Sequence, residues 1–411
     1  MTSKLMIVLA LNACAITCPH SVVAQVTFTN LGVVPSGTWS KSYGVNADGS
    51  VVVGSVLVSI PGSGGNRGFR WTAQTGMQSV GVLPGGGSDT YGVNATGDMV
   101  VGVSAGRAFR WTPTGGMQSL GFLPGGNNSW GTGVNAVGTT VVGHSLAPSE
   151  PHAFRWTAQL GMVDLGTFPG ESRSWAQAIS ADGSVVIGYA ELAGRNRAVA
   201  WTGMGIQDLG VLSTGDFSSA TAVNDDGSVI VGWGSGAGAP PYQAFRWTTV
   251  GGMQNIGMTA GAKSCRALGV SGDGAIVVGT DTNGAFIWST SQGITGLYAY
   301  LTSQGVNLAG WSLAEATAVC TDGSAIVGWG DFNGQTRAWL VTGIPAPEPL
   351  CFANCDRSTT APILNVNDFA CFLNLYAAAD PGANCDGTTV PPVLNVNDFA
   401  CFLNRFAAGC P

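Results

Sequence analysis

The sequence predicts an all-β protein, a seven-bladed β-propeller followed by a small α-helical domain, and three observations carry this prediction. A pattern of short apolar segments occurs seven times between residues 26 and 344. Glycine accounts for 63 of the 411 residues and charged residues for only 9%, a composition that favours tight turns over long helices. Close to the C-terminus, a different motif occurs twice with an offset of 30 residues.

Each repeat contains a hairpin in which a turn glycine separates two apolar arms, as in VNADG at 45–49 followed by VVVG at 51–54. The turn glycines, 41 to 49 residues apart, are Gly49, Gly97, Gly138, Gly183, Gly227, Gly274 and Gly323. A second element, FRWT at 69–72, recurs with its tryptophan at Trp71, Trp111, Trp156, Trp201, Trp247, Trp288 and Trp339. A Leu-Gly element, first seen at 31–32, also counts to seven. Four apolar segments in each period of about 45 residues predict the four strands of a propeller blade.

The residue types assign roles to these segments. Val and Ile crowd the second hairpin arm, which is typical of a buried inner strand. The Asp-Gly at the hairpin turn supplies the positive φ that a tight turn requires. The repeated tryptophan is expected to pack between neighbouring blades, because no single unit of this size can bury it alone.

The two ends of the repeat region predict how the ring closes. An open stack of repeats is the alternative, and it needs atypical capping units at each end. Here the region starts with a Leu-Gly strand at 26–34 and ends with the Trp339 strand. The two strands complement each other in one closing blade, and ring closure removes exposed sheet edges.

These motifs resemble a known family. The repeated unit is similar to the HAF repeat of bacterial extracellular proteins in four motifs: FRWT, GGMQSLG, VNA followed by glycine two residues later, and VVG. The resemblance covers all seven units and departs from the family pattern in the fourth and seventh, which read VAW at 199–201 and RAW at 337–339. It implies a secreted protein and no particular reaction.

The N-terminus and the composition indicate where the chain works. Residues 1–24 have the layout of a secretory signal peptide, with a short apolar run and small residues before Gln25. A lipoprotein modified at Cys14 is a minor alternative. No stretch is long enough to span a membrane, and a net charge of −7 with scattered basic residues argues against nucleic acid as a partner. Six of the ten cysteines lie between Cys351 and Cys410, which suits an oxidising, extracellular compartment.

The C-terminal part is expected to form a separate domain. Residues 345–349 make a Pro-rich linker, and 350–411 contain the paired motif, in which a loop rich in oxygen donors leads into a short helix. A loop of this kind followed by a helix is the pattern of an EF-hand calcium site. The pair resembles the cysteine-bearing dockerin-like tails of secreted bacterial proteins, which implies a cohesin-like partner. After each expected ligand asparagine this chain has Val-Asn, at 366–367 and 396–397, where well-known dockerins have a hydroxylic pair.

The spacing of the donors places two Ca²⁺ sites within this resemblance. The expected side-chain ligands are Asn354, Asp356, Ser358, Asn365 and Asp368 in the first loop and Asn384, Asp386, Thr388, Asn395 and Asp398 in the second. Backbone carbonyls of Ile363 and Val393 would complete them. Two carboxylates per site predict affinity in the weak, extracellular range. The alternative is a disulfide-stapled helical pair whose Asp residues cap the helices; a bridge between Cys351 and Cys410 is one of fifteen possible connectivities.

The rest of the sequence contains few residues or motifs that suggest catalysis. Acids at five of the hairpin turns, such as Asp48 and Asp182, are best explained as turn residues. Five aromatics lie between the Leu-Gly element and the hairpin, and they either form a platform for a glycan or protein or cover the blade rims: Trp39, Trp130, Trp175, Phe217 and Trp311. Cys265 and Cys320 either pair between blades or stay free.

Three readings of the function follow. The first is a secreted, non-enzymatic binding or structural propeller that is attached to an extracellular assembly or cell surface through the calcium module. The second is a carbohydrate-active enzyme, a polysaccharide hydrolase or lyase, delivered by the dockerin-like tail. The third is a surface scaffold that only displays or spaces something. The sequence leaves enzymatic activity uncertain and names no catalytic residue.

Overall fold

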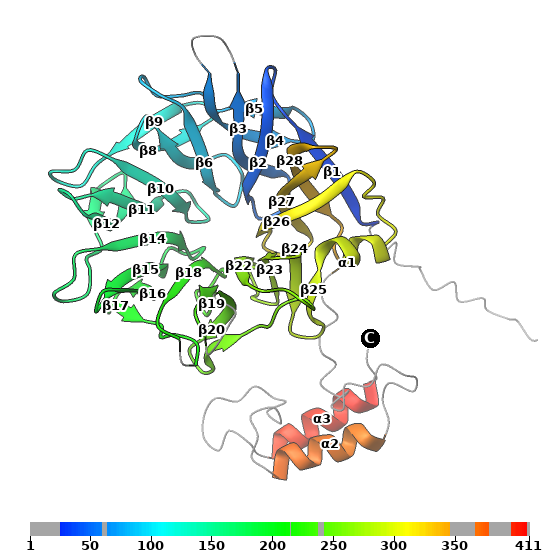
Figure 1. Cartoon of the computed structure of the whole chain (residues 1–411). Helices are drawn as coiled ribbons and strands as arrows, with labels where there is room; N and C mark the ends of the chain where they lie inside the picture. The colour runs from blue at the N-terminus through cyan, green and yellow to red at the C-terminus, as the bar shows by residue number, and fades with distance from the viewer. Residues whose placement is uncertain are drawn as a thin grey trace, which may run out of the picture.

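The computed structural model describes residues 25–59, 64–213, 215–236, 242–345, 366–377 and 396–408. Seven antiparallel sheets of four strands each surround a central axis (Figure 1). The prediction of a seven-bladed β-propeller is therefore confirmed. The expected signal peptide, residues 1–24, lies outside the described residues.

The first four blades follow one another along the chain. Blade 1 contains β2 (Gly37–Val45), β3 (Val51–Val58), β4 (Gly65–Thr72) and β5 (Gly76–Ser79). Blade 2 contains β6 (Ser88–Val93), β7 (Val100–Ser104), β8 (Arg107–Thr112) and β9 (Gly116–Gly121). Blade 3 contains β10 (Ser129–Val134), β11 (Thr140–Leu146), β12 (Pro151–Thr157) and β13 (Gly161–Asp164). Blade 4 contains β14 (Ser174–Ile179), β15 (Val186–Leu192), β16 (Arg195–Thr202) and β17 (Gly205–Asp208).

The remaining blades end with one that both ends of the repeat region build. Blade 5 contains β18 (Ser218–Val223), β19 (Val229–Gly234), β20 (Gln243–Thr248) and β21 (Gly252–Asn255). Blade 6 contains β22 (Cys265–Val270), β23 (Ile276–Asp281), β24 (Gly284–Ser289) and β25 (Gly293–Gly296), and helix α1 (Leu297–Ser303) follows it. Blade 7 contains β26 (Trp311–Val319), β27 (Ala325–Phe332), β28 (Gln335–Thr342) and the N-terminal strand β1 (Thr27–Gly32).

Blade 7 closes the ring as the sequence predicts. β1 pairs with β28 in antiparallel register, with Thr27 opposite Thr342 and Phe28 opposite Val341. The hydroxyl oxygens of Thr27 and Thr342 lie 2.7 Å apart. The N-terminal strand thus supplies the outermost strand of the last blade.

A ring of backbone hydrogen bonds also joins all seven blades. The N–H of Ala47 in the first hairpin turn donates to the carbonyl of Ala95 in the next turn, at 3.3 Å. The series continues Ala95 to Ala136, Ala136 to Ala181, Ala181 to Asp225, Asp225 to Gly272 and Gly272 to Thr321. The N–H of Thr321 then donates back to the carbonyl of Ala47, at 3.2 Å. All seven bonds run in the same sense, so each turn is tied to the next around the axis.

The order of strands within a blade corrects one expectation. The second hairpin arm is buried as predicted, with Val52 and Val53 of β3 both at 0% exposure. It is nevertheless the second strand from the axis, because the first arm lines the channel. The reason is that the second strand is covered by blades on both faces and so takes a continuous β-branched run, whereas the innermost strand faces an open channel on one side.

Each innermost strand carries a β-bulge that leaves one residue unpaired. In β2 the register shifts between Ser42 and Gly44, so that Tyr43 has no partner in β3. The second strand has a glycine opposite every bulge: Gly54, Gly102, Gly143, Gly188, Gly232, Gly279 and Gly328. A Cβ at any of them would collide with a backbone oxygen of the innermost strand. The glycine of the VVG element is therefore required by sterics, since a bulge brings the two backbones too close for a side chain.

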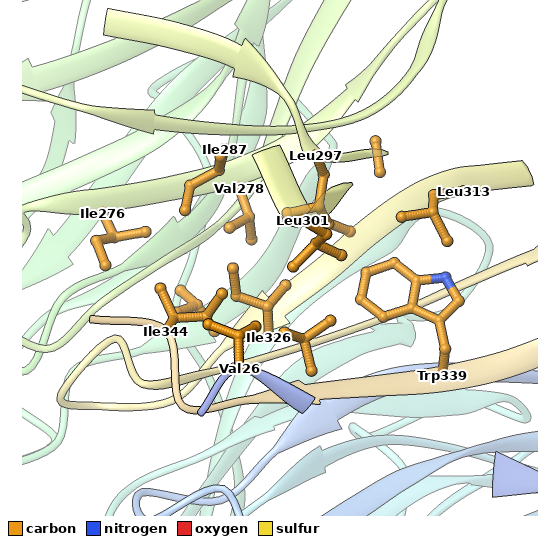
Figure 2. Close-up of a cluster of buried hydrophobic side chains, with 14 of the residues drawn as sticks. Val26, Ile276, Val278, Ile287, Leu297, Leu301, Leu313, Ile326, Trp339 and Ile344 are labelled. Carbon is orange, nitrogen blue, oxygen red and sulfur yellow. The ribbon is translucent and has the colours of Figure 1, made fainter. Parts of the chain in front are cut away.

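The core lies between blades rather than within them. Trp71 of β4 packs with Ala325 and Val327 of the preceding blade, and the five tryptophans that follow it in the repeat also cluster with residues of the blade before them. Figure 2 shows the cluster between blades 6 and 7, where Ile276 and Ile287 meet side chains of blade 7 and α1. The predicted packing of the repeated tryptophan is confirmed for these six.

The seventh tryptophan is not the equivalent of the other six. Gly328 pairs with Trp339, whereas Gly54 in blade 1 pairs with Phe69. Trp339 therefore takes the place of the phenylalanine, and Val341 takes the place of the tryptophan. The expected alignment of RAW with FRW was wrong by two residues, because the register is fixed by the bulge and its glycine rather than by the aromatic residue.

Two further helices are described in the C-terminal region, α2 (Val366–Ala377) and α3 (Val396–Ala408). The Phe372 and Phe402 rings stack at a centroid distance of 4.1 Å and an interplanar angle of 8°. Both are buried, at 1% and 0% exposure. The two copies of the C-terminal motif thus form a packed helical pair through equivalent residues.

Candidate functional site

The innermost strands enclose a cavity of about 590 Å³ along the channel axis. The bulged residues of all seven strands line it: Tyr43, Tyr91, Thr132, Gln177, Thr221, Leu268 and Thr317. A collar of β-branched residues separates it from a second cavity of about 280 Å³ beside the hairpin turns: Val45, Val93, Val134, Ile179, Val223, Val270 and Val319. The larger volume falls within the range of small-molecule sites, roughly 300–1,000 Å³. We call its polar end, lined by Tyr43, Tyr91, Trp130, His144, Gln177 and Glu315, the channel mouth.

The polar groups of the cavity wall divide into two kinds. The hydroxyls of Thr132, Thr221 and Thr317 each donate to a backbone oxygen of the next blade, at 3.0, 2.8 and 3.0 Å. They are part of the scaffold. The remaining polar bulge residues are Tyr43, Tyr91 and Gln177. Their side chains are available to bind a ligand.

The tyrosines sit side by side at the mouth. The rings of Tyr43 and Tyr91 lie 5.7 Å apart and are tilted by 47°. Burial, together with the nearby carboxylates of Asp89 and Glu315, raises the pKa of Tyr43 to about 12. Burial likewise raises the pKa of Tyr91. Both phenols therefore keep their protons at neutral pH and can donate hydrogen bonds.

Trp130 and His144 form an aromatic stack from neighbouring strands of blade 3. They are directly opposite in the β10–β11 ladder, with rings 4.8 Å apart and 14° from parallel. Burial lowers the pKa of His144 to about 4, so the imidazole is neutral at pH 7. Its Nδ1 is buried and has no hydrogen-bond partner among the described residues.

Four charged side chains lie around the mouth, and each makes a contact within the protein. Arg266 lies 3.5 Å from the carboxylate of Glu315, which also accepts a hydrogen bond from the indole of Trp329 at 3.2 Å. The ammonium of Lys41 lies over the Trp329 ring, 3.5 Å from its centroid. Asp89 accepts a hydrogen bond from the Asn66 amide at 2.9 Å. Two positive and two negative groups therefore balance each other.

The five aromatics expected to form a platform do not lie together. Only Trp130 lines the cavity. Trp175, at the equivalent position of blade 4, stacks on Tyr189 at 4.7 Å. The other three lie away from the channel wall: Trp39 faces Leu57 across β2 and β3, Phe217 packs with Trp233 and Tyr242, and Trp311 packs with Phe28 and Phe332. For Phe217 and Trp311 the alternative of covering a blade rim describes the contacts.

The turn acids act as the sequence predicts. The carboxylate of Asp48 accepts hydrogen bonds from the hydroxyl and the backbone N–H of Ser50, at 2.5 and 2.9 Å. These bonds lower its pKa. Asp182 is held in the same way by Ser180 and Ser184. Such contacts are those of a turn, in which the side chain bonds the backbone two residues on.

Cys265 and Cys320 are free and buried, which settles the two possibilities the sequence left open. Cys320 occupies the turn position that is Asn46 in blade 1: the N–H of Ala325 bonds to its sulfur, as that of Val51 bonds to the Asn46 side chain. Burial raises the pKa of both thiols, that of Cys265 to about 12.

The expected calcium ligands fall largely outside the described residues: Asn354, Asp356, Ser358, Asn365, Asn384, Asp386, Thr388 and Asn395. Asp368 and Asp398 are described and lie in the first turns of α2 and α3, both at 0% exposure. In the described ranges, no three His, Cys, Asp or Glu side chains cluster in a way that could hold a metal ion. The calcium sites stay a prediction.

None of the described helices has the length and hydropathy to cross a membrane.

Comparison with known proteins shows the fold alone. No family model and no curated protein matches the sequence. An oligogalacturonate lyase in complex with manganese has a TM-score of 0.54 at 15% identity, covering 78% of this chain and 93% of that one. An oligogalacturonate lyase from Vibrio parahaemolyticus has a TM-score of 0.55 at 12% identity, covering 77% and 93%. TolB from Acinetobacter baumannii has a TM-score of 0.44 at 11% identity, and this chain covers 65% of its length.

The bulged residues are not among the site residues predicted from the sequence, although the sequence contains a signal for them. Each one stands three residues before the Asn, Ser or Cys that opens the hairpin turn, as Tyr43 stands before Asn46 and Gln177 before Ser180. Small residues flank most of them. A single large or polar residue between small ones in an innermost strand is the pattern of a side chain aimed at the channel.

Proposed function

We propose that this chain is a secreted, non-enzymatic binding propeller whose ligand enters the channel mouth. One observation carries the proposal: a cavity of about 590 Å³ brings together aromatic rings and hydrogen-bonding groups that the scaffold does not use. Sites with these properties are typical of small ligands or the ends of larger ones. In this proposal the propeller provides recognition, and the C-terminal region provides attachment.

The attachment part of the proposal rests on the C-terminal helical pair. Asp368 and Asp398 are fully buried at equivalent positions of α2 and α3. Carboxylate oxygens at equivalent positions of the two repeated motifs are of the ligand type that Ca²⁺ prefers. Together with the oxygen donors of the preceding loops, these two residues would complete two Ca²⁺ sites of a dockerin-like module. Its partner would be a cohesin-like protein or another component of the cell surface, and its cysteines would form disulfides outside the cell.

Calcium titration calorimetry on the full-length secreted chain tests the attachment module. We expect heat from about two sites of submillimolar to millimolar affinity, lost in a variant carrying Asp368→Ala and Asp398→Ala. Asp226→Asn, which removes a turn carboxylate of the propeller, is the matched control and leaves the calcium heat unchanged. No heat at millimolar calcium, or heat that the double variant retains, contradicts the module.

A carbohydrate-active enzyme is the second candidate, and one observation favours it. Asp89 and Glu315 both influence Tyr43 from the flanking blades, and paired carboxylates perform glycoside hydrolysis. In this protein both acids are engaged, by Asn66 and by Arg266 with Trp329. Incubation with polysaccharides and assay of new reducing ends or unsaturated products separates the two candidates. Turnover that Glu315→Gln abolishes would establish the enzyme and refute the binding proposal.

A further inference from the structure

The channel mouth contains polar groups whose hydrogen bonds are left for a ligand. Within the described chain, neither the Tyr43 and Tyr91 hydroxyls nor the Gln177 amide has a hydrogen-bond partner. Equivalent bulge positions in three other blades hold threonines that bond the neighbouring blade. Where the scaffold could have used a threonine, these three residues instead present two phenols and an amide to the cavity. Phenols donate and accept, and an amide does both at once.

The electrostatics of the mouth select against a charged ligand. Lys41, Asp89, Arg266 and Glu315 carry two charges of each sign, and each has a partner in the protein. Arg266 is paired with Glu315, and the Lys41 ammonium lies over the Trp329 ring. An anionic ligand would have to draw one of these cations away from its contact. Since His144 is neutral at pH 7, it adds no charge. The side-chain hydrogen-bonding groups of Tyr43, Tyr91 and Gln177 are uncharged, and the four charges around them sum to zero.

An apolar surface accompanies these groups. Trp130, stacked on His144, lines the same cavity as Gln177 and the tyrosine pair. A ligand that suits this wall must have several hydroxyls, no charge and an apolar face to lie against an aromatic ring. A pyranose sugar has this combination, with axial C–H groups on its faces and hydroxyls at its edge.

We infer that the channel mouth binds the neutral sugar units of a glycan, with Trp130 under a sugar face and Gln177, Tyr43 and Tyr91 bonding its hydroxyls. This inference rests on the proposed binding function and names its ligand class. It differs from a rim platform, because the ligand enters the axis of the ring. The β-branched collar bounds the cavity on the side of the hairpin turns, so we expect an end or a short branch of the glycan to enter from the opposite side.

The test uses the full-length secreted chain and isothermal titration with defined oligosaccharides. The neutral probes are cello-, xylo-, manno-, malto- and laminari-oligosaccharides, and an oligogalacturonide is the acidic probe. We expect at least one neutral probe to bind. Trp130→Ala then weakens its binding about tenfold or more, as for a central aromatic anchor, and Gln177→Ala weakens it about three- to tenfold, as for one uncharged hydrogen bond.

Trp175→Ala is the matched control. It removes the same residue type from the equivalent position of blade 4, where the indole stacks on Tyr189 and does not line the cavity. It leaves the affinity within about twofold. Circular dichroism confirms that each variant is folded, so that a loss of binding reports the site.

Three outcomes overturn the inference. They are binding of the acidic probe alone, no binding of any neutral probe at millimolar concentration, and neutral binding that Trp130→Ala and Gln177→Ala leave unchanged. Trp130-dependent binding of the acidic probe would leave the proposed binding function standing, whereas release of cleaved product in the titration mixture would refute that function itself.

Discussion

Replacing Gly232 by alanine tests the steric account of the repeated glycine. A Cβ at this position would lie 2.7 Å from Cζ of Phe245 and closer still to the backbone oxygen of Ser219, inside the 3.0 Å that real Cβ atoms keep. Phe245 is fully buried, at 0% exposure, so the ring cannot turn towards solvent. Overpacking of this kind costs about 1–3 kcal/mol, and shifting the bulge weakens one or two ladder hydrogen bonds at about 1 kcal/mol each. We expect a loss of about 3 kcal/mol.

The measurement is thermal unfolding followed by calorimetry. For a propeller of this size, 3 kcal/mol corresponds to a Tm about 4 °C lower. Gly203→Ala is the control, because Gly203 has an unstrained φ and a Cβ added there would meet nothing within 4 Å; it leaves the Tm unchanged or raises it slightly. If both variants unfold at the same temperature, the bulge does not require the glycine and the steric account is refuted.

Three other predictions follow from the packing and the ring. Trp71→Ala removes a large side chain from between blades 7 and 1 and lowers the free energy of unfolding by about 3–5 kcal/mol. Met204→Ala, at a position 96% exposed, is the control and lowers it by less than about 0.5 kcal/mol. Equal losses of the two variants in chemical denaturation would contradict the inter-blade core. Cysteines at Thr27 and Thr342 form an intramolecular disulfide, visible on a non-reducing gel, because these residues are directly opposite in blade 7; a chain that cross-links only between molecules would contradict closure by β1. Gln177→Thr provides an inter-blade hydrogen bond and raises the free energy of unfolding by about 0.5–1.5 kcal/mol, while it weakens saccharide binding. Thermal unfolding measures the change in stability, and titration measures the change in affinity. A lowered Tm would contradict the assignment of Gln177 to the ligand.

The sequence predicted the blade count and the closing blade because the signal was repeated. Seven turn glycines with the same apolar runs leave little freedom in the number of units, and the Leu-Gly strand at the start matches the strand missing at the end. The order of strands across a blade was harder, because burial alone does not tell a strand beside the channel from one between two blades. The continuous Val and Ile run identified the more buried strand, and that is the second one.

The misplacement of Trp339 has a similar cause. The alignment of RAW with FRW uses the tryptophan as the fixed point of the repeat, whereas the fixed point is the glycine opposite the bulge. The threonine that follows the tryptophan in five blades is Thr342 in blade 7, directly after Val341. That threonine marks the correct register, and the larger Trp339 fills the phenylalanine position beside Gly328.

The channel site was harder to predict, because it is made by one residue from each of several blades. These residues share a position three residues before the hairpin turn, but that position shows its meaning only once the innermost strand and its bulge are known. Only the closed ring brings Tyr43, Tyr91 and Gln177 to one cavity. The calcium sites are the opposite case, since each is proposed within one short segment and a local pattern is enough to predict it.

The innermost strand of each blade must pair with the second strand and must also present side chains to the cavity. The bulge assigns these two roles to different residues. The residues on either side of the bulged position pair with the second strand and must suit the ladder in every blade. The bulged residue has no ladder partner, so its side chain is free to differ between blades without disturbing the register. Threonine at this position strengthens the ring by bonding the next blade, as Thr317 does to Ser42. Each tyrosine or glutamine in its place gives up that bond and gains a group that faces the cavity. The blades in which the scaffold gives up this bond for a polar side chain are therefore the ones that we expect to determine what the propeller binds.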